Sequence, residues 1–259
     1  MRFVVAFLSL MALSGFGVPA SAAWYEASSD HFVIYADDSE KDVREFSQNL
    51  ERYHSALEYV IGREIAKPSP SNRLVIFVVG DQSDIRRLAG TDSRSIAGFY
   101  IPRAGASRAF VQNIRMKSGY PSFSTTVLLH EYAHHFLIAS SSYAMPRWLS
   151  EGSAEFFAAA TFNSDGSVQV GRPAQHRAGE LAFADEVPVR ELLDAGLYDS
   201  RERSRYDAFY GRSWLLYHFL TFEESRRGQL TEYLNRMIAG GTSIEAADAA
   251  FGDLDELEK

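Results

Sequence analysis

The 259-residue chain contains no cysteine. It therefore forms no disulfide, offers no thiolate to a metal and has no cysteine that could carry an N-terminal lipid. Any metal site must be built from histidine and carboxylate side chains, and the chain has 7 His and 34 Asp and Glu to supply them.

Positive charge is in deficit, with 26 Lys and Arg against 34 Asp and Glu, for a formal net charge of −8. No basic patch with interleaved aromatic residues is visible, so no nucleic-acid partner is expected. Internal repeats and low-complexity segments are also lacking. Hydrophobic residues make up 46% of the chain, which is ample for one packed domain and only marginal for two.

Long apolar runs are lacking except at the start of the chain. Residues 3–13 are apolar, follow Arg2 and precede the small residues Ala20-Ser21-Ala22. The run is too short to span a bilayer and is typical of a signal peptide over residues 1–22, although a buried N-terminal helix is the alternative. We expect export to the periplasm or the medium. No later segment approaches the roughly 20 apolar residues of a membrane span.

Hydrophobic periodicity predicts an α+β fold in a single domain over residues 23–259, with an α/β lobe over about 23–140 and a mainly helical lobe over about 141–259. A cleft between the lobes is the default place for a ligand. The expected strands are 31–35, 74–79, 98–101, 108–114 and 168–170. The expected helices are 39–62, 83–88, 124–138, 146–161, 188–195, 206–222, 226–239 and 243–251.

A histidine pair lies on the first helix of the central region, where residues 130–134 read His-Glu-Tyr-Ala-His. Residues four apart share one helix face, so His130 and His134 can both reach one ion. Glu131 is too close to His130 to complete a tetrahedron, but it is suitably placed to contact a water molecule on the metal. The alternative is a hydrogen-bonded histidine pair without a metal.

The next helix carries a carboxylate pair, Glu151 and Glu155, again four residues apart on one face. Buried carboxylates are costly unless they are paired or bind a metal. Two helices that each present a polar i,i+4 pair within an apolar stripe are hard to explain by packing alone. The pattern therefore favours a metal site over a pair of surface carboxylates.

H-E-x-x-H followed by W-x-x-E-G-x-A-E resembles the gluzincins, the peptidase MA-like superfamily of thermolysin and aminopeptidase N, and most closely an exported bacterial family of unknown function within it. The resemblance implies a zincin fold and one zinc ion per chain, bound by His130, His134 and Glu151. It implies that Glu155 orients His130 through Nδ1–H. Aminopeptidases carry Asn where this chain has Ser150, whose hydroxyl could still accept from His134.

The same resemblance implies a peptidase mechanism. Zinc with three protein ligands keeps a position open for water, and Glu131 is expected to act as general base. A tetrahedral oxyanion needs a further donor. Tyr210 matches the tyrosine at the start of an aminopeptidase helix, and His218 competes by analogy with thermolysin. The two lie about 12 Å apart along a helix, so they are unlikely to serve the same oxygen; Tyr206 is the next candidate.

The remaining histidines lack the spacing of ligands. His135 lies about 100° around the helix from His134 and is expected to be a packed or hydrogen-bonded bystander. His31, His54 and His176 have no partner at ligand spacing and are not expected to bind the metal.

The expected partner is a peptide or protein substrate. Aminopeptidases of this superfamily grip the free amine with a strand glutamate, whereas the matching residues 108–113 contain no acidic residue. That favours an endopeptidase whose strand pairs with an extended substrate. Two alternatives stay open: a zinc amidase acting on cell-wall fragments, and a catalytically silent zincin that serves as a binding module. Retention of Glu131 argues against the second alternative.

Overall fold

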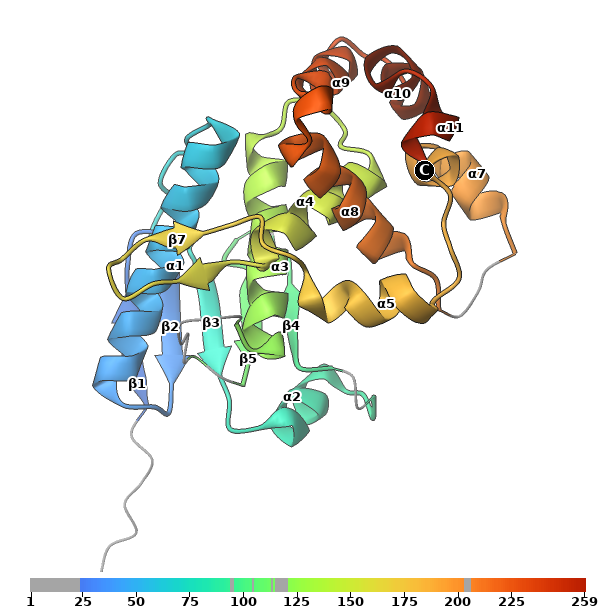
Figure 1. Cartoon of the computed structure of the whole chain (residues 1–259). Coiled ribbons are helices and arrows are strands. Elements are labelled where there is room, and N and C mark those ends of the chain that lie inside the picture. Colours follow the sequence, from blue (N-terminus) through green and yellow to red (C-terminus); the bar gives the residue numbers. More distant parts are fainter. Residues whose placement is uncertain (1–23, 94–95, 104, 113, 115–120, 203–205) are drawn as a thin grey trace, which may run out of the picture.

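The computed structural model describes residues 24–259 apart from 94–95, 104, 113, 115–120 and 203–205. The signal peptide expected over residues 1–22 lies outside the described residues. The fold is mixed α+β, as predicted, with a five-stranded sheet in the first half and mainly helices in the second (Figure 1). The sheets contain β1 (Tyr25–Ser28), β2 (Phe32–Ala36), β3 (Leu74–Val78), β4 (Gly98–Ile101), β5 (Arg108–Val111), β6 (Thr161–Phe162) and β7 (Val168–Gln169). The α-helices are α1 (Glu40–Ile61), α2 (Gln82–Ala89), α3 (Phe123–Ser140), α4 (Arg147–Ala158), α5 (Ala178–Phe183), α6 (Val189–Leu193), α7 (Ala195–Ser200), α8 (Phe209–Phe222), α9 (Gln229–Ile238), α10 (Ser243–Phe251) and α11 (Leu254–Leu257), with short 3-10 turns at Gln175–Arg177 and Glu224–Arg226.

The five-stranded sheet has the order β1-β2-β3-β5-β4. Strands β2, β3 and β5 run parallel, and β1 and β4 add antiparallel edges. The sequence predicted that residues 108–113 would pair with a peptide, but β5 lies between β3 and β4 and both its sides are paired. The open edge near the central helices belongs to β4. Strand order depends on how β4 and β5 fold back on each other, and the alternation of residues along one strand does not specify it.

Helix α1 covers the β1–β2 side of the sheet, and α3 covers the β4–β5 side (Figure 1). The predicted limits of α1 are confirmed. Ser39 accepts from the backbone of Asp42, and Gly62 ends the helix with φ of 69°, a left-handed conformation that glycine adopts without strain. The Tyr53 hydroxyl of α1 donates to the Leu129 carbonyl of α3 over 3.0 Å, which joins the two helices above the sheet.

Helix α4 ends three residues earlier than predicted. The sequence favoured a helix through residue 161, but Thr161 and Phe162 pair with Val168 and Gln169 in a two-stranded hairpin. The turn between them holds Gly166 at φ of 89°. The predicted helix over 188–195 is likewise divided, because Asp194 accepts from two backbone N–H groups and starts α7. Strand β1 and the short helices α5 and α11 were not predicted.

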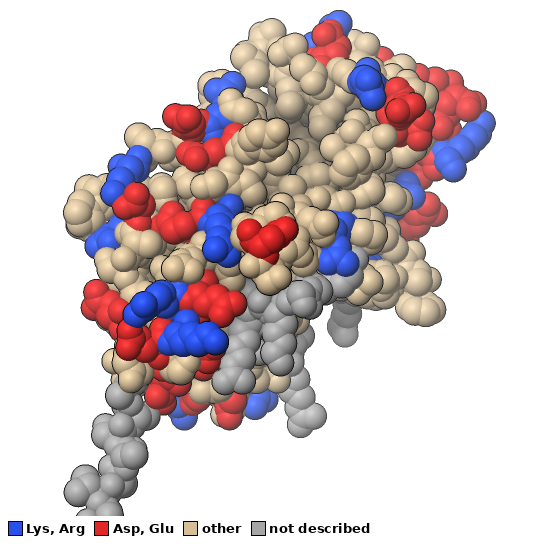
Figure 2. All heavy atoms as spheres, turned by 60° about the vertical axis from the view of Figure 1, so that its left-hand side comes forward, with Lys and Arg blue, Asp and Glu red and all other residues tan. Residues whose placement is uncertain are grey.

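The first hydrophobic core lies between the sheet and the helices α1, α3 and α4, and the second lies among the C-terminal helices. Helix α4 contributes to both, because Phe157 is buried in the first core and Trp148 in the second. No helix in the described ranges is long and apolar enough to cross a membrane. On the face shown in Figure 2, basic side chains are interspersed with acidic ones.

The crossing of α4 and α8 is unusually close at Gly152. A Cβ atom built there would lie 2.3 Å from the Ser213 carbonyl oxygen, a distance that real Cβ atoms do not show. Gly152 directly follows Glu151, so this contact sets where the α4 side chains lie relative to α8.

We expect Gly152→Ala to lower the free energy of unfolding by roughly 1–3 kcal/mol, and with it the melting temperature, because the helices must separate to admit the methyl group. Gly179→Ala in α5 is the matched control, since its Cβ would meet no atom within 4 Å. The control should melt at or slightly above the wild-type temperature. Thermal melts of both variants are the measurement, and a Gly152→Ala protein as stable as wild type would contradict the close packing.

Candidate functional site

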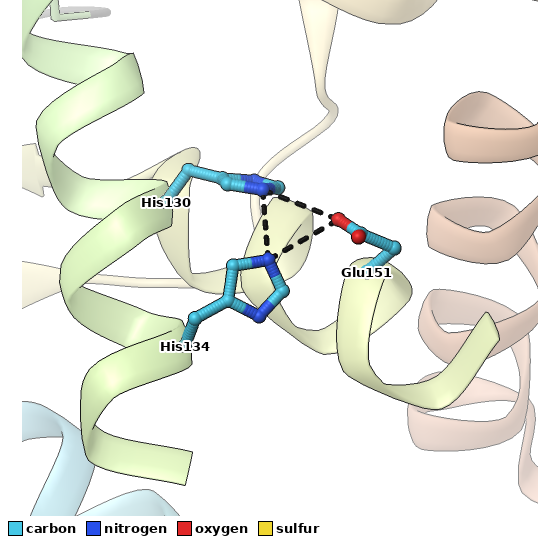
Figure 3. A group of neighbouring side chains, drawn as sticks. All are labelled: His130, His134 and Glu151. Atoms are coloured by element: carbon cyan, nitrogen blue, oxygen red, sulfur yellow. Dashed lines mark hydrogen bonds and ion pairs between the residues drawn. The ribbon is translucent and has the colours of Figure 1, made fainter. Parts of the chain in front are cut away.

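Three side chains from two helices converge on one point (Figure 3). The Nε2 atom of His134 lies 3.0 Å from Nε2 of His130 and 3.2 Å from Oε2 of Glu151. Nε2 of His130 lies 3.3 Å from the same carboxylate oxygen. His130 and His134 project from α3, and Glu151 projects toward them from α4. All three are half-buried. They form the one group of this kind among the described residues that could hold a metal ion.

The outer nitrogen of each ring has its own partner. Nδ1 of His130 lies 3.1 Å from Oε1 of Glu155, and a carboxylate oxygen can only accept a proton here. The proton of a neutral His130 ring therefore lies on Nδ1, and its Nε2 lone pair faces the convergence point. Nδ1 of His134 lies 3.1 Å from the Ser150 hydroxyl, which can accept in the same way. Glu155 and Ser150 thus each lie beside the outer nitrogen of one of the two histidines.

The electrostatics of the group favour positive charge at its centre. Burial lowers the pKa of His130, but the contacts and charges of Glu151 and Glu155 outweigh burial and raise that pKa to about 9. Burial likewise opposes ionisation of Glu151, but its contacts with His130 and His134 lower its pKa to about 2. Two carboxylates beside two imidazoles therefore attract a cation, either a proton or a metal ion.

Glu155 is the most deeply buried charge of the site, with 1% of its surface exposed. Beside His130 it contacts Nε2 of His176 and the guanidinium of Arg177. Burial raises the pKa of the Glu155 carboxyl, but the contacts with His130, His176 and Arg177 outweigh burial and hold it well below its usual range. Glu155 is therefore an ionised carboxylate that fixes the orientation of His130.

The Glu155 network continues to α8. Arg177 also pairs with Glu180 over 3.0 Å, and Glu180 accepts from the backbone N–H of Gly211 over 2.7 Å. Neither Arg177 nor Glu180 was singled out from the sequence. His176 lies outside the metal-ligand group. Its contact with Glu155 carried no sequence signal, because the two residues are separated by a hairpin and a turn.

Glu131 is half-buried and makes no hydrogen bond or ion pair within the described part of the chain. Its charge acts on Tyr100 of β4: burial raises the pKa of the Tyr100 hydroxyl, and Glu131 raises that pKa further. Helix α3, which carries Glu131, packs against β4, an edge strand of the sheet. The Glu131 carboxylate is available to exchange a proton with a bound molecule.

Tyr210, in the first turn of α8, reaches the site. Its ring centroid lies 6.5 Å from that of His130, and the Arg177 guanidinium lies over it at 4.7 Å. Burial and the charge of Glu151 raise the pKa of the Tyr210 hydroxyl, against the nearby guanidinium groups of Arg147 and Arg177, which lower it.

The competing candidates are not brought into the group. Nε2 of His218 lies 3.1 Å from the Gly171 carbonyl, and its ring packs against Trp214 and Phe222. His218 is therefore a structural residue of the α8 face that covers Gly171. Tyr206 is 54% exposed and precedes α8.

The other histidines also lie outside the metal-ligand group, as expected. His135 stacks on Tyr132, and its Nδ1 lies 3.4 Å from the Tyr100 hydroxyl. His31 and His54 stack on each other with ring centroids 3.6 Å apart.

Comparison with known proteins adds a family of undetermined role. Residues 124–239 match the family model described as "Protein of unknown function (DUF1570)". The match covers less than half of the chain, but it includes α3, α4 and the start of α8, which carry the converging side chains and Tyr210. No curated protein matches the chain.

Proposed function

We propose that the protein is a zinc-dependent peptidase, with zinc bound by His130, His134 and Glu151. The observation that carries the proposal is the triangle of their ligand atoms, with sides of 3.0, 3.2 and 3.3 Å. Ligand atoms about 2.0–2.1 Å from a tetrahedral zinc lie about 3.3 Å from one another. Two histidines and one glutamate are also a ligand set that catalytic zinc uses, and the outer contacts to Glu155 and Ser150 are of the kind that orient metal-bound imidazoles.

When bound, zinc acts as a Lewis acid that lowers the pKa of water to about 7 and polarises a carbonyl group. Glu131, which has no other partner among the described residues, takes a proton from the attacking water and returns it to the leaving amine. Tyr210 directs its hydroxyl proton toward the oxygen on which negative charge develops. Arg177 lies over the Tyr210 ring and helps to hold it in place.

The assignment to a gluzincin with a zincin-like fold is part of the proposal. A mixed sheet with an open antiparallel edge, a helix carrying both histidines beside it and a second helix carrying the glutamate all support it. Export through a signal peptide is proposed from the sequence, and it agrees with a metal site that needs no thiol.

Strand β4 supports an endopeptidase. It is an edge strand that packs against α3, the helix that carries Glu131, so an extended peptide can add to the sheet there. The strand reads Gly98-Phe99-Tyr100-Ile101 and, like residues 108–113, offers no carboxylate to grip a free amine. No contact in the described residues favours a cell-wall amidase or a silent binding module over peptide hydrolysis.

We expect one zinc ion per chain, lost on His130→Ala, His134→Ala or Glu151→Ala. His135→Ala is the matched control, because His135 lies on the same helix but outside the ligand group. Elemental analysis of dialysed protein is the measurement. An unchanged zinc content in the Glu151 variant would refute the assignment of the third ligand.

Glu131→Gln should retain the fold and the zinc but lose turnover by several orders of magnitude, because it removes proton transfer without touching the ligands. A peptide-library digest with and without chelator identifies a substrate, and steady-state kinetics on that substrate compare the variant with wild type. Near-normal activity in the variant would rule out Glu131 as the base.

Tyr210→Phe should lower kcat by about 10²–10³ with little change in KM or zinc content, because a donor to the oxyanion gains strength only in the transition state. His218→Gln is the comparison, since His218 bonds to a backbone carbonyl and should affect mainly the melting temperature. The same kinetics apply to both variants. If Tyr210→Phe is silent while His218→Gln is crippled, the roles are reversed.

A further inference from the structure

Arg147 is an exposed cation beside the proposed metal ligands. It is the first residue of α4, and its side chain pairs with no carboxylate in the part of the chain that the structure describes. The other arginines nearby are neutralised: Arg177 pairs with Glu155 and Glu180, and Arg201 pairs with Glu191 over 3.1 Å. Arg147 therefore keeps a full positive charge for a bound molecule.

Aromatic contacts hold this guanidinium in position. Its central carbon lies 4.4 Å from the centroid of the Phe209 ring and 5.3 Å from that of Tyr198. A stacked guanidinium retains donors at its edge, and because it is already ordered, less conformational entropy is lost when it binds a carboxylate. This arrangement is suited to bidentate recognition of a planar anion.

Arg147 lies close enough to Glu151 to contact a substrate residue that neighbours the bond held at the metal ligands. Arg147 and Glu151 are four residues apart on α4, so they share a face and are separated by about 6 Å along the helix. Burial lowers the pKa of Arg147, but Tyr210, Tyr198 and the charge of Glu151 outweigh burial and raise it. A group bound to Arg147 would therefore belong to a residue close to the bond held at the metal ligands.

We propose that Arg147 binds a carboxylate of the substrate next to the scissile bond, so that the protein selects acidic peptides. The inference rests on the proposed peptidase function and adds a substrate class to it. An acidic peptide would otherwise be repelled by a chain of net charge −8 that presents Glu131 in the same site. The carboxylate can come from an Asp or Glu side chain or from the C-terminus of the peptide.

The test uses fluorescent octapeptides of Ala, Leu and Phe with blocked termini. Each peptide contains one Glu, whose position differs from peptide to peptide. A matched peptide has Gln in place of that Glu. A second pair differs only in a free or amidated C-terminus. Binding is measured by fluorescence anisotropy on the zinc-loaded Glu131→Gln protein, and kcat/KM is measured on the active protein. One position, or the free C-terminus, should be preferred by about 10- to 100-fold, the worth of a charge-assisted hydrogen bond.

Arg147→Gln should reduce this preference to about one, and Arg147→Lys should retain part of it because a charge without the planar fork remains. Arg190→Gln, which removes a surface arginine that pairs with Asp255, is the matched control and should leave the preference unchanged. Melting temperatures establish that each variant is folded.

Two results would overturn the inference: no preference for a carboxylate at any position, or a preference that survives in Arg147→Gln. If Arg147 served only to hold Tyr210, its removal would slow both peptides of a pair equally and leave their ratio intact, which is the second result. A protein that binds peptides but cleaves none and takes up no zinc would refute the proposed function, while the anisotropy ratio would still decide the role of Arg147.

Discussion

A single buried carboxylate organises the site. Glu155 has 1% of its surface exposed, and an ionised group at that depth is stable only with partners on all sides. It finds them in His130, His176 and Arg177, which come from α3 and from the segment after the hairpin. Removing any of them would leave charge uncompensated, so the demand for neutrality ties these segments together. The orientation of His130 follows from that demand.

The consequences extend along α4 and into α8. The stripe of α4 that carries Glu151 and Glu155 faces the histidines, while Gly152 lies against the backbone of Ser213. Arg177 transmits the position of Glu155 to Glu180, which accepts from the backbone at Gly211, next to Tyr210. The proposed ligands and the proposed oxyanion donor are thus placed by one connected set of charges and one close helix crossing.

Charge also distinguishes the two arginines of the site. Arg177 forms ion pairs with Glu155 and Glu180, and its role is structural. Arg147 stacks on aromatic rings instead of pairing with an acid, so its charge remains directed at whatever enters the site. Glu131 is the corresponding acid without a partner among the described residues. With the roles proposed for them, proton acceptor and anion-binding cation, the two residues suit a substrate that carries negative charge near the reacting bond.

The sequence by itself determined the features that depend on neighbouring residues: the caps of α1, the helical faces that pair His130 with His134 and Glu151 with Glu155, and the α+β class. These follow from helix periodicity and local backbone preferences. Only the tertiary structure decided that β4 rather than β5 has the open edge, that His176 and Arg177 contact Glu155, and that Arg147 pairs with no carboxylate among the described residues. Such contacts join segments far apart in the chain, where packing and the pairing of buried charge decide and local pattern carries no information.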